Sequence, residues 1–346
     1  MLNRRTTLAT IGALAVAMAA PPLGASAAMP SRRLPPRLKR GDKVGLAAPA
    51  AFVADRFGLE ELDHVITAMG LKPVHGEHVL ERNGYLAGDD RARASDLNRM
   101  FADPEIRAIF AVRGGWGVQR MLPYVDWEIV RANPKLVIGY SDITALHLAI
   151  AKQAGFTTIH GPNASASWPQ DVWEAFRAIA FDASTQTYNM PEMPEAMLGM
   201  RGPRARTFGK GKARGRLLGG NLTVLASLVG TPWLPDFTGR LLFLEDIGEA
   251  EYRIDRMLTQ IGQAGILDAC AGVVFGECTR CSNPDGGLGN FTLYEVLDHH
   301  LGRLGKPAFQ GPRFGHISDN FPLPVGTMAE IDADAGTIRL LEAAVA

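Results

Sequence analysis

A serine near the middle of the chain, Ser141, stands where a strand turns into a helix. Residues 136–138 are an apolar run of strand type, and Gly139 permits the tight backbone of a turn. Apolar residues then recur at helical spacing over 143–150. A hydroxyl at such a turn lies beside a helix N-terminus, as in a nucleophile elbow. Because position 143 is Ile, the usual Gly-x-Ser-x-Gly pattern is not met, and Ser141 could instead serve only as a helix cap.

A serine nucleophile needs a base, and the base needs an orienting group. Among the eight histidines, His160 ends a predicted strand and His316 lies in a turn-rich loop, and spacing alone does not decide between them. His147 lies two turns into the helix after Ser141 and is expected to face the interior. Glu245 ends an apolar strand, where a carboxylate is either a helix cap or a functional acid.

A glycine-rich loop, Arg-Gly-Gly-Trp-Gly at 113–117, follows another predicted strand. Because three positions have no side chain, its backbone N–H groups can approach a ligand closely. The loop is not Gly-x-Gly-x-x-Gly and no P-loop lysine follows, so a nucleotide site is not expected. The pattern favours an oxyanion-binding or carboxylate-binding role, with a tight structural turn as the alternative.

Strands alternating with helices predict an α/β fold with a parallel sheet in the first half of the chain. Strands are expected at 44–47, 73–74, 108–112, 136–138 and 157–159, and helices at 59–69, 91–101, 118–122 and 142–155. In such sheets ligands sit outside the carboxyl ends of the strands, so the glycine-rich loop and Ser141 should share one edge. In the second half we expect strands at 217–218, 240–244 and 273–275, helices at 222–228, 252–261 and 291–301, and a closing hairpin of 328–331 with 337–341.

The chain divides into four predicted segments. Residues 1–27 form an export signal, 41–165 an N-terminal domain that carries the nucleophile, and 206–346 a C-terminal domain that supplies the acid and the base. Residues 166–205 lack clear periodicity and contain several prolines, so they are interpreted as the crossing between the domains.

The first 27 residues combine paired arginines, an uncharged apolar run and a small-residue cleavage site. This pattern favours the twin-arginine export route over an ordinary Sec signal and predicts a periplasmic protein. The apolar run is too short for a membrane anchor. The formal net charge is 0 and no basic stripe is present, which argues against a nucleic-acid partner.

The three cysteines are Cys270, Cys278 and Cys281. Cys278 and Cys281 could form a disulfide in an oxidising compartment, or half of a zinc site. No second Cys/His pair has suitable spacing, so no metal is predicted. The preferred interpretation is small side chains near a strand end.

Taken together, several stretches in order resemble the LD-carboxypeptidases, a serine peptidase family that includes murein tetrapeptide carboxypeptidases and microcin C self-immunity peptidases. The resemblance runs from about residue 41 to the C-terminus. The matching motifs lie at 112–117, 139–146, 219–222, 242–246, 252–256 and 315–316.

The resemblance implies that Ser141 is the nucleophile, His316 the base and Glu245 its orienting carboxylate. It implies a flavodoxin- or Rossmann-like N-terminal domain and a C-terminal α/β domain, with the active site at their interface. The oxyanion hole would use the N–H of Asp142 and one from Gly114 or Gly115.

The same resemblance implies roles for three further positions. Arg113 and Asn221 would hold substrate. Trp116, where tyrosine is commoner in the family, would stack on substrate or fill space.

The implied reaction is hydrolysis of the bond between diaminopimelate and D-alanine in a peptidoglycan tetrapeptide or muropeptide, without a cofactor, by a homodimer. The export signal departs from many relatives, which act in the cytoplasm on recycled muropeptides. The rivals are a microcin C immunity-type peptidase, a non-catalytic periplasmic binding protein and, more weakly, a general esterase.

Overall fold

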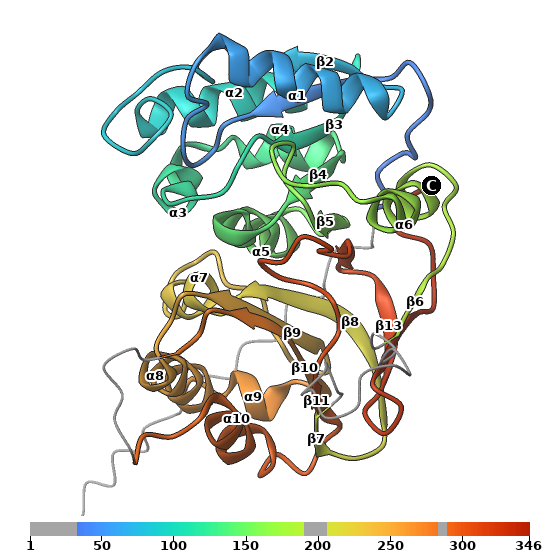
Figure 1. Ribbon diagram of the computed structural model, residues 1–346. Coiled ribbons are helices and arrows are strands. Elements are labelled where there is room, and N and C mark those ends of the chain that lie inside the picture. Colours follow the sequence, from blue (N-terminus) through green and yellow to red (C-terminus); the bar gives the residue numbers. More distant parts are fainter. Residues whose placement is uncertain (1–32, 190–205, 283–288) are drawn as a thin grey trace, which may run out of the picture. The chain divides into compact units, whose positions relative to one another are not determined.

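The computed structural model describes residues 33–189, 206–282 and 289–346, so the export signal expected at 1–27 lies outside the described residues. Two sheets organise the compact unit Ser31–Ala346, and Figure 1 shows the helices around them. In the described ranges, no helix combines the length and apolar character needed to cross a bilayer.

The first sheet is the predicted parallel one. Its five parallel strands run in the order β5-β4-β3-β1-β2. They are β1 (Lys43–Ala47), β2 (Lys72–His75), β3 (Ile106–Ala111), β4 (Leu136–Gly139) and β5 (Thr158–His160). The helices between them are α1 (Arg56–Ala68), α2 (Asp90–Ala102), α3 (Val118–Met121), α4 (Trp127–Ala132) and α5 (Thr144–Gln153). Two 3-10 turns complete this half, η1 (Leu122–Tyr124) and η2 (Ser141–Ile143). All four residues of β4 are buried, as expected for a strand covered by helices on both faces.

A strand from near the C-terminus completes this sheet. β12 (Leu323–Val325) pairs antiparallel with β5, with Leu323 opposite His160. The sequence pattern did not predict this strand, because it is only three residues long and its middle residue is a proline.

The second sheet is mixed. Its strands run in the order β6-β14-β13-β8-β9-β10-β11-β7, with parallel pairing from β8 to β11 and antiparallel strands on both sides. They are β7 (Arg206–Gly209), β8 (Lys212–Asn221), β9 (Leu241–Ile247), β10 (Gly272–Thr279), β11 (Ala308–Gln310), β13 (Met328–Asp332) and β14 (Thr337–Leu340). The associated helices are α7 (Leu222–Ser227), α8 (Glu251–Gln263), α9 (Ile266–Ala269) and α10 (Leu293–Leu301). The predicted closing hairpin is confirmed as β13 with β14.

The segment 166–205, which lacks clear periodicity as a whole, contains a helix. This is α6 (Gln170–Ala180), whose buried side chains include Val172, Phe176 and Ile179 at helical spacing. The short strand β6 (Thr187–Tyr188) follows it and joins the second sheet. The rest of the segment, 190–205, lies outside the described residues.

The start of α5 is where the two sheets meet. The backbone N–H of Asn221, at the end of β8, donates a 2.9 Å hydrogen bond to Thr144 Oγ1. A Cβ on Gly220 would lie 2.4 Å from the same oxygen, so only glycine allows this approach. Figure 1 shows α5 between β5 and α7, and contacts join it to both β8 and α7. The contact brings the carboxyl ends of both sheets to the helix that follows Ser141.

Candidate active site

Ser141 lies on a strained turn rather than in a helix cap. It follows β4 closely and has φ 64°, in the left-handed region that non-glycine residues rarely adopt. Its side chain makes no capping hydrogen bond to η2 or to α5. The alternative that Ser141 serves only as a cap is therefore not supported, and the strained strand-to-helix turn is that of a nucleophile elbow.

Asp142 ties this turn to the helix that follows the glycine-rich loop. Its carboxylate is buried, and Oδ2 accepts a 2.8 Å hydrogen bond from the N–H of Val118, the first residue of α3. Burial raises the pKa of Asp142 to about 6, against the opposing effects of that hydrogen bond and of the Arg93 charge. The backbone N–H of Asp142, predicted for the oxyanion hole, is at the start of a helical turn, where N–H groups lack internal partners.

The glycine-rich loop packs directly against Ser141. A Cβ placed on Gly114 would lie 2.8 Å from the Ser141 Cβ and 3.1 Å from its Oγ. Gly115 has φ +132°, and a Cβ there would lie 2.9 Å from the Cβ of Ala51. Both positions therefore need glycine, and the backbone of the loop packs closely against Ser141.

We expect Gly114→Ala to lower kcat/KM by about 10²-fold, because the new methyl group must displace Ser141 from its position. The measurement is steady-state hydrolysis, with circular dichroism to confirm folding. Gly262→Ala is the matched control, since a Cβ there makes only an ordinary 3.5 Å contact in α8. Equal activity of the two variants would contradict the close approach of the loop.

Glu245 and His316 are brought together from distant parts of the chain. Glu245 Oε2 and His316 Nδ1 are 2.7 Å apart. The glutamate side chain is fully buried, and the histidine side chain is 13% exposed to solvent. The helix-cap alternative for Glu245 is wrong, because it lies inside β9 and Ala250 is the residue before α8. Thr279 Oγ1 fixes the backbone by donating a 2.9 Å hydrogen bond to the His316 carbonyl.

Tyr140 connects this pair to the serine. Its ring centroid is 4.8 Å from that of His316, and Tyr140 is the residue before Ser141. Burial and the Glu245 charge raise the pKa of Tyr140. Tyr140 belongs to the motif at 139–146, but its type and spacing give no sign of this contact.

The structure separates the two candidate bases that spacing leaves open. His160 is completely buried, and neither ring nitrogen has a hydrogen-bond partner among the described residues. Burial, helped by the neighbouring His147 and His316, lowers its pKa well below 6.5. His316 is partly exposed and hydrogen-bonded to a carboxylate, so it can exchange a proton with a ligand and His160 cannot.

Asn221, predicted to hold substrate, is buried and makes hydrogen bonds within the protein. It is 4% exposed, its Oδ1 caps α7 by accepting from the Val224 N–H, and its Nδ2 donates to Asp246. Asp246 also accepts from Thr223, and burial raises its pKa to about 6 against these hydrogen bonds. The sequence pattern missed this network, whose parts lie on two strands and a helix start.

Arg113 and Trp116 lie at the solvent-facing side of the loop. Trp116 is 45% exposed, which leaves its ring accessible for stacking. Arg113 is exposed and makes no ion pair or hydrogen bond with any described residue. Both side chains are therefore accessible to a ligand.

His147 faces the interior as predicted, and its Nε2 donates a 2.8 Å hydrogen bond to the Gly139 carbonyl. Burial lowers its pKa to about 4, so below pH 6.5 the unfolded chain takes up a proton before the folded one. We expect the unfolding free energy of the wild type, relative to His147→Gln, to fall by about 2 kcal/mol from pH 7.5 to pH 5. Urea unfolding at both pH values measures this, and a constant difference would contradict the assigned burial.

The preferred interpretation of the cysteines is wrong for two of them. Cys278 and Cys281 form a disulfide at the end of β10, and Cys270 is free and buried. In the part of the chain that the structure describes, no group of three or more His, Cys, Asp or Glu side chains is arranged to hold a metal ion.

Two family models match the chain. The model of the LD-carboxypeptidase N-terminal domain covers residues 44–161, and that of the LD-carboxypeptidase C-terminal domain covers residues 214–331. The nucleophile turn lies in the first match and Glu245 and His316 in the second.

Individual relatives agree with these matches. A putative carboxypeptidase of Streptomyces coelicolor is 40% identical over 88% of this chain and 95% of its own length. A probable murein peptide carboxypeptidase of Bacillus subtilis is 36% identical over 90% of this chain and 95% of its own length.

Solved structures share the two-domain α/β fold. The microcin C7 self-immunity protein MccF matches with a TM-score of 0.80 at 25% identity, covering 91% of this chain and 100% of that one. A muramoyltetrapeptide carboxypeptidase from Oxalobacter formigenes matches with a TM-score of 0.74 at 28% identity, covering 86% of this chain and 97% of that one. With both domain models in order and these relatives along almost their whole length, the chain belongs to the LD-carboxypeptidase family of serine peptidases.

Proposed function

We propose that this protein is a serine LD-carboxypeptidase that releases the terminal D-alanine from peptidoglycan tetrapeptide stems through a Ser141–His316–Glu245 triad. The observation that carries the proposal is the 2.7 Å contact between His316 and the buried Glu245, with the His316 ring against the residue that precedes Ser141. The probable murein peptide carboxypeptidase of Bacillus subtilis among the relatives supports the choice of substrate.

In this proposal Ser141 Oγ attacks the carbonyl carbon between diaminopimelate and D-alanine. Glu245 holds the Nδ1–H of His316, so Nε2 is the nitrogen that takes the serine proton and later gives it to the leaving amine. The N–H of Asp142 and one from Gly114 or Gly115 stabilise the oxyanion, each worth about 3–4 kcal/mol of barrier. Water then hydrolyses the acyl-enzyme.

The place of action follows from the same proposal. An exported enzyme would meet peptidoglycan or its fragments in the periplasm, and the Cys278–Cys281 disulfide supports an oxidising compartment. Fractionation of cells that express the full chain tests this location. The homodimer stays a prediction, which light scattering of the purified protein tests.

The rival within the family is an immunity-type peptidase that cleaves aminoacyl-sulfamoyl adenylates. The high structural similarity to MccF favours keeping it as a second candidate. Cytoplasmic processing of that toxin disfavours it for an exported protein.

Supplying both substrates to the purified protein separates the candidates. The proposal expects D-alanine release from the tetrapeptide and no cleavage of aspartyl sulfamoyl adenosine, with activity unaffected by a chelator. Cleavage of the sulfamoyl compound alone would overturn the proposal in favour of the rival. Absence of both activities, with no labelling by a serine-reactive phosphonate, would favour a binding protein.

A further inference from the structure

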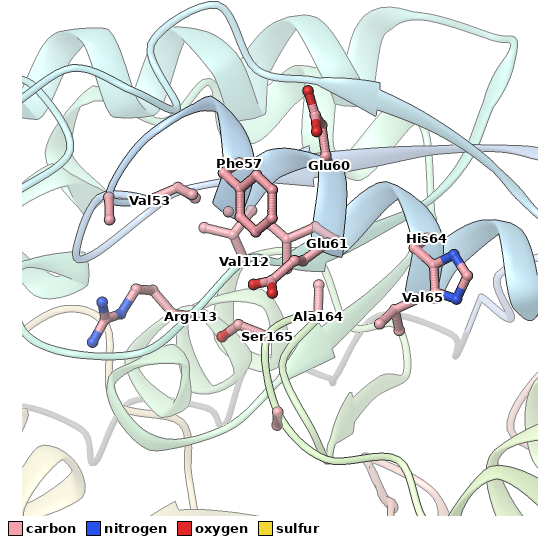
Figure 2. Close-up of a pocket in the computed structure, with 14 residues that line it drawn as sticks. Val53, Phe57, Glu60, Glu61, His64, Val65, Val112, Arg113, Ala164 and Ser165 are labelled. Carbon is pink, nitrogen blue, oxygen red and sulfur yellow. The ribbon is translucent and has the colours of Figure 1, made fainter.

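A cavity of about 620 Å³ lies between α1 and the segments that follow β3 and β5, and Arg113 in its wall directly precedes the loop that packs against Ser141. Its walls include Val53, Phe57 and Glu61 on one side and Val112, Arg113 and Ser165 on the other (Figure 2). The volume is in the range of cavities that hold drug-sized ligands, which is much more than one alanine residue fills. The cavity therefore suits the acyl part of a peptide substrate better than the D-alanine that leaves.

The segments that line the cavity are joined to the nucleophile turn by chain neighbours and by hydrogen bonds. Arg113 directly precedes Gly114, which packs against Ser141. On the other side, the Ser165 N–H donates a 3.1 Å hydrogen bond to the Val112 carbonyl. The Tyr140 N–H donates a 3.2 Å hydrogen bond to Asn163 Oδ1. A group bound in the cavity is thus held in a fixed relation to the serine.

The cavity is lined by a carboxylate, Glu61, and a guanidinium, Arg113, that form no ion pair with each other. Glu61 and Arg113 are both exposed, and neither makes an ion pair or a hydrogen bond with a described residue. Figure 2 shows the Glu61 carboxylate directed toward the Ser165 side chain, with Phe57 above it and the Arg113 side chain on the other side of Ser165. An occupant that carries both an ammonium and a carboxylate would satisfy both groups.

We propose that this cavity binds the free amino acid end of the diaminopimelate side chain, with its ammonium on Glu61 and its carboxylate on Arg113. This rests on the proposed function, because it assigns the residue whose carbonyl Ser141 attacks. The side chain of lysine, the corresponding residue in other peptidoglycans, ends in an ammonium alone. Arg113 then determines the specificity for diaminopimelate, and Glu61 recognises the ammonium in either peptide.

Three tetrapeptides test the proposal, with diaminopimelate, lysine or norleucine at the third position. The wild type is expected to prefer the diaminopimelate peptide over the lysine peptide by about 10- to 100-fold in kcat/KM, as for one charged hydrogen-bonded contact. Arg113→Gln should remove that preference, mainly through KM. Glu61→Gln should lower kcat/KM for both charged peptides relative to the norleucine peptide.

Glu174→Gln is the matched control for Glu61→Gln, since Glu174 is an exposed glutamate on α6 and both substitutions change the net charge equally. It should leave all three kcat/KM values unchanged. Equal wild-type activity on all three peptides, or an equal loss on all three in Arg113→Gln, would overturn the assignment of the cavity while leaving the carboxypeptidase intact. Failure to release D-alanine from any peptide would instead refute the proposed function, and this inference with it.

Discussion

Replacing Ser141 by alanine is expected to lower kcat for D-alanine release from a tetrapeptide by about 10⁴-fold or more. The reason is chemical, since the variant keeps the Cβ and the loop contacts but loses the oxygen that attacks the carbonyl. The strained backbone at φ 64° persists, so the melting temperature should stay within a few degrees of the wild type. Chromatographic detection of D-alanine measures the loss.

A second substitution separates the chemistry from the backbone. Ser141→Gly should be equally inactive but no less stable, because glycine adopts a positive φ without strain. Neither variant should react with a serine-directed phosphonate that labels the wild type. Undiminished release of D-alanine in Ser141→Ala would exclude the serine mechanism.

Glu245→Gln is expected to lower kcat by about 10³- to 10⁴-fold without unfolding the protein. The carboxylate accepts from His316 Nδ1 and stabilises the charged imidazole that forms when the serine gives up its proton. An amide of the same shape cannot supply that charge and can present N–H to the ring, which favours the wrong tautomer. KM should change little, because Glu245 is fully buried and cannot touch substrate.

The control for this prediction is Glu330→Gln. Glu330 is in the same sheet and pairs with Arg214 and Arg339, so its loss also removes ionic contacts. It should reduce stability slightly and leave kcat unchanged. If Glu245→Gln kept wild-type kcat while His316→Ala was inactive, His316 would act without an orienting carboxylate.

The parts of the site that depend on local order could be read from the sequence. The turn at Ser141 follows from an apolar strand, a glycine and a helix in immediate succession, and all three are present as predicted. The placement of Glu245 near the carboxyl end of β9 likewise follows from the apolar run before it. These features need only neighbours in the chain, so their signals are contained in short windows.

The choice between the two candidate bases could not be read in this way. His160 is inert because Phe243 from β9 packs on its ring and Leu323 from β12 pairs with its backbone. Both partners are far from His160 in sequence, and no sequence pattern around them predicts the contact. The structural use of Asn221 was hidden for the same reason, since Asp246 comes from the next strand of the sheet.

Helix α6 was missed for a different cause. The prolines around it suggested a crossing segment, although Val172, Phe176 and Ile179 follow helical spacing. The disulfide was undervalued because two cysteines alone do not establish a redox environment.

The pairing of β12 with β5 has a consequence for biosynthesis. A chain emerging from the ribosome can build the parallel strands of the first sheet early, but nearly half the protein must still be made before β12 is available. Until then β5 is an uncovered edge of the kind that invites pairing between molecules. The nascent nucleophile half therefore depends on a strand that is synthesised much later, and a truncation before Leu323 should yield aggregates rather than a stable fragment.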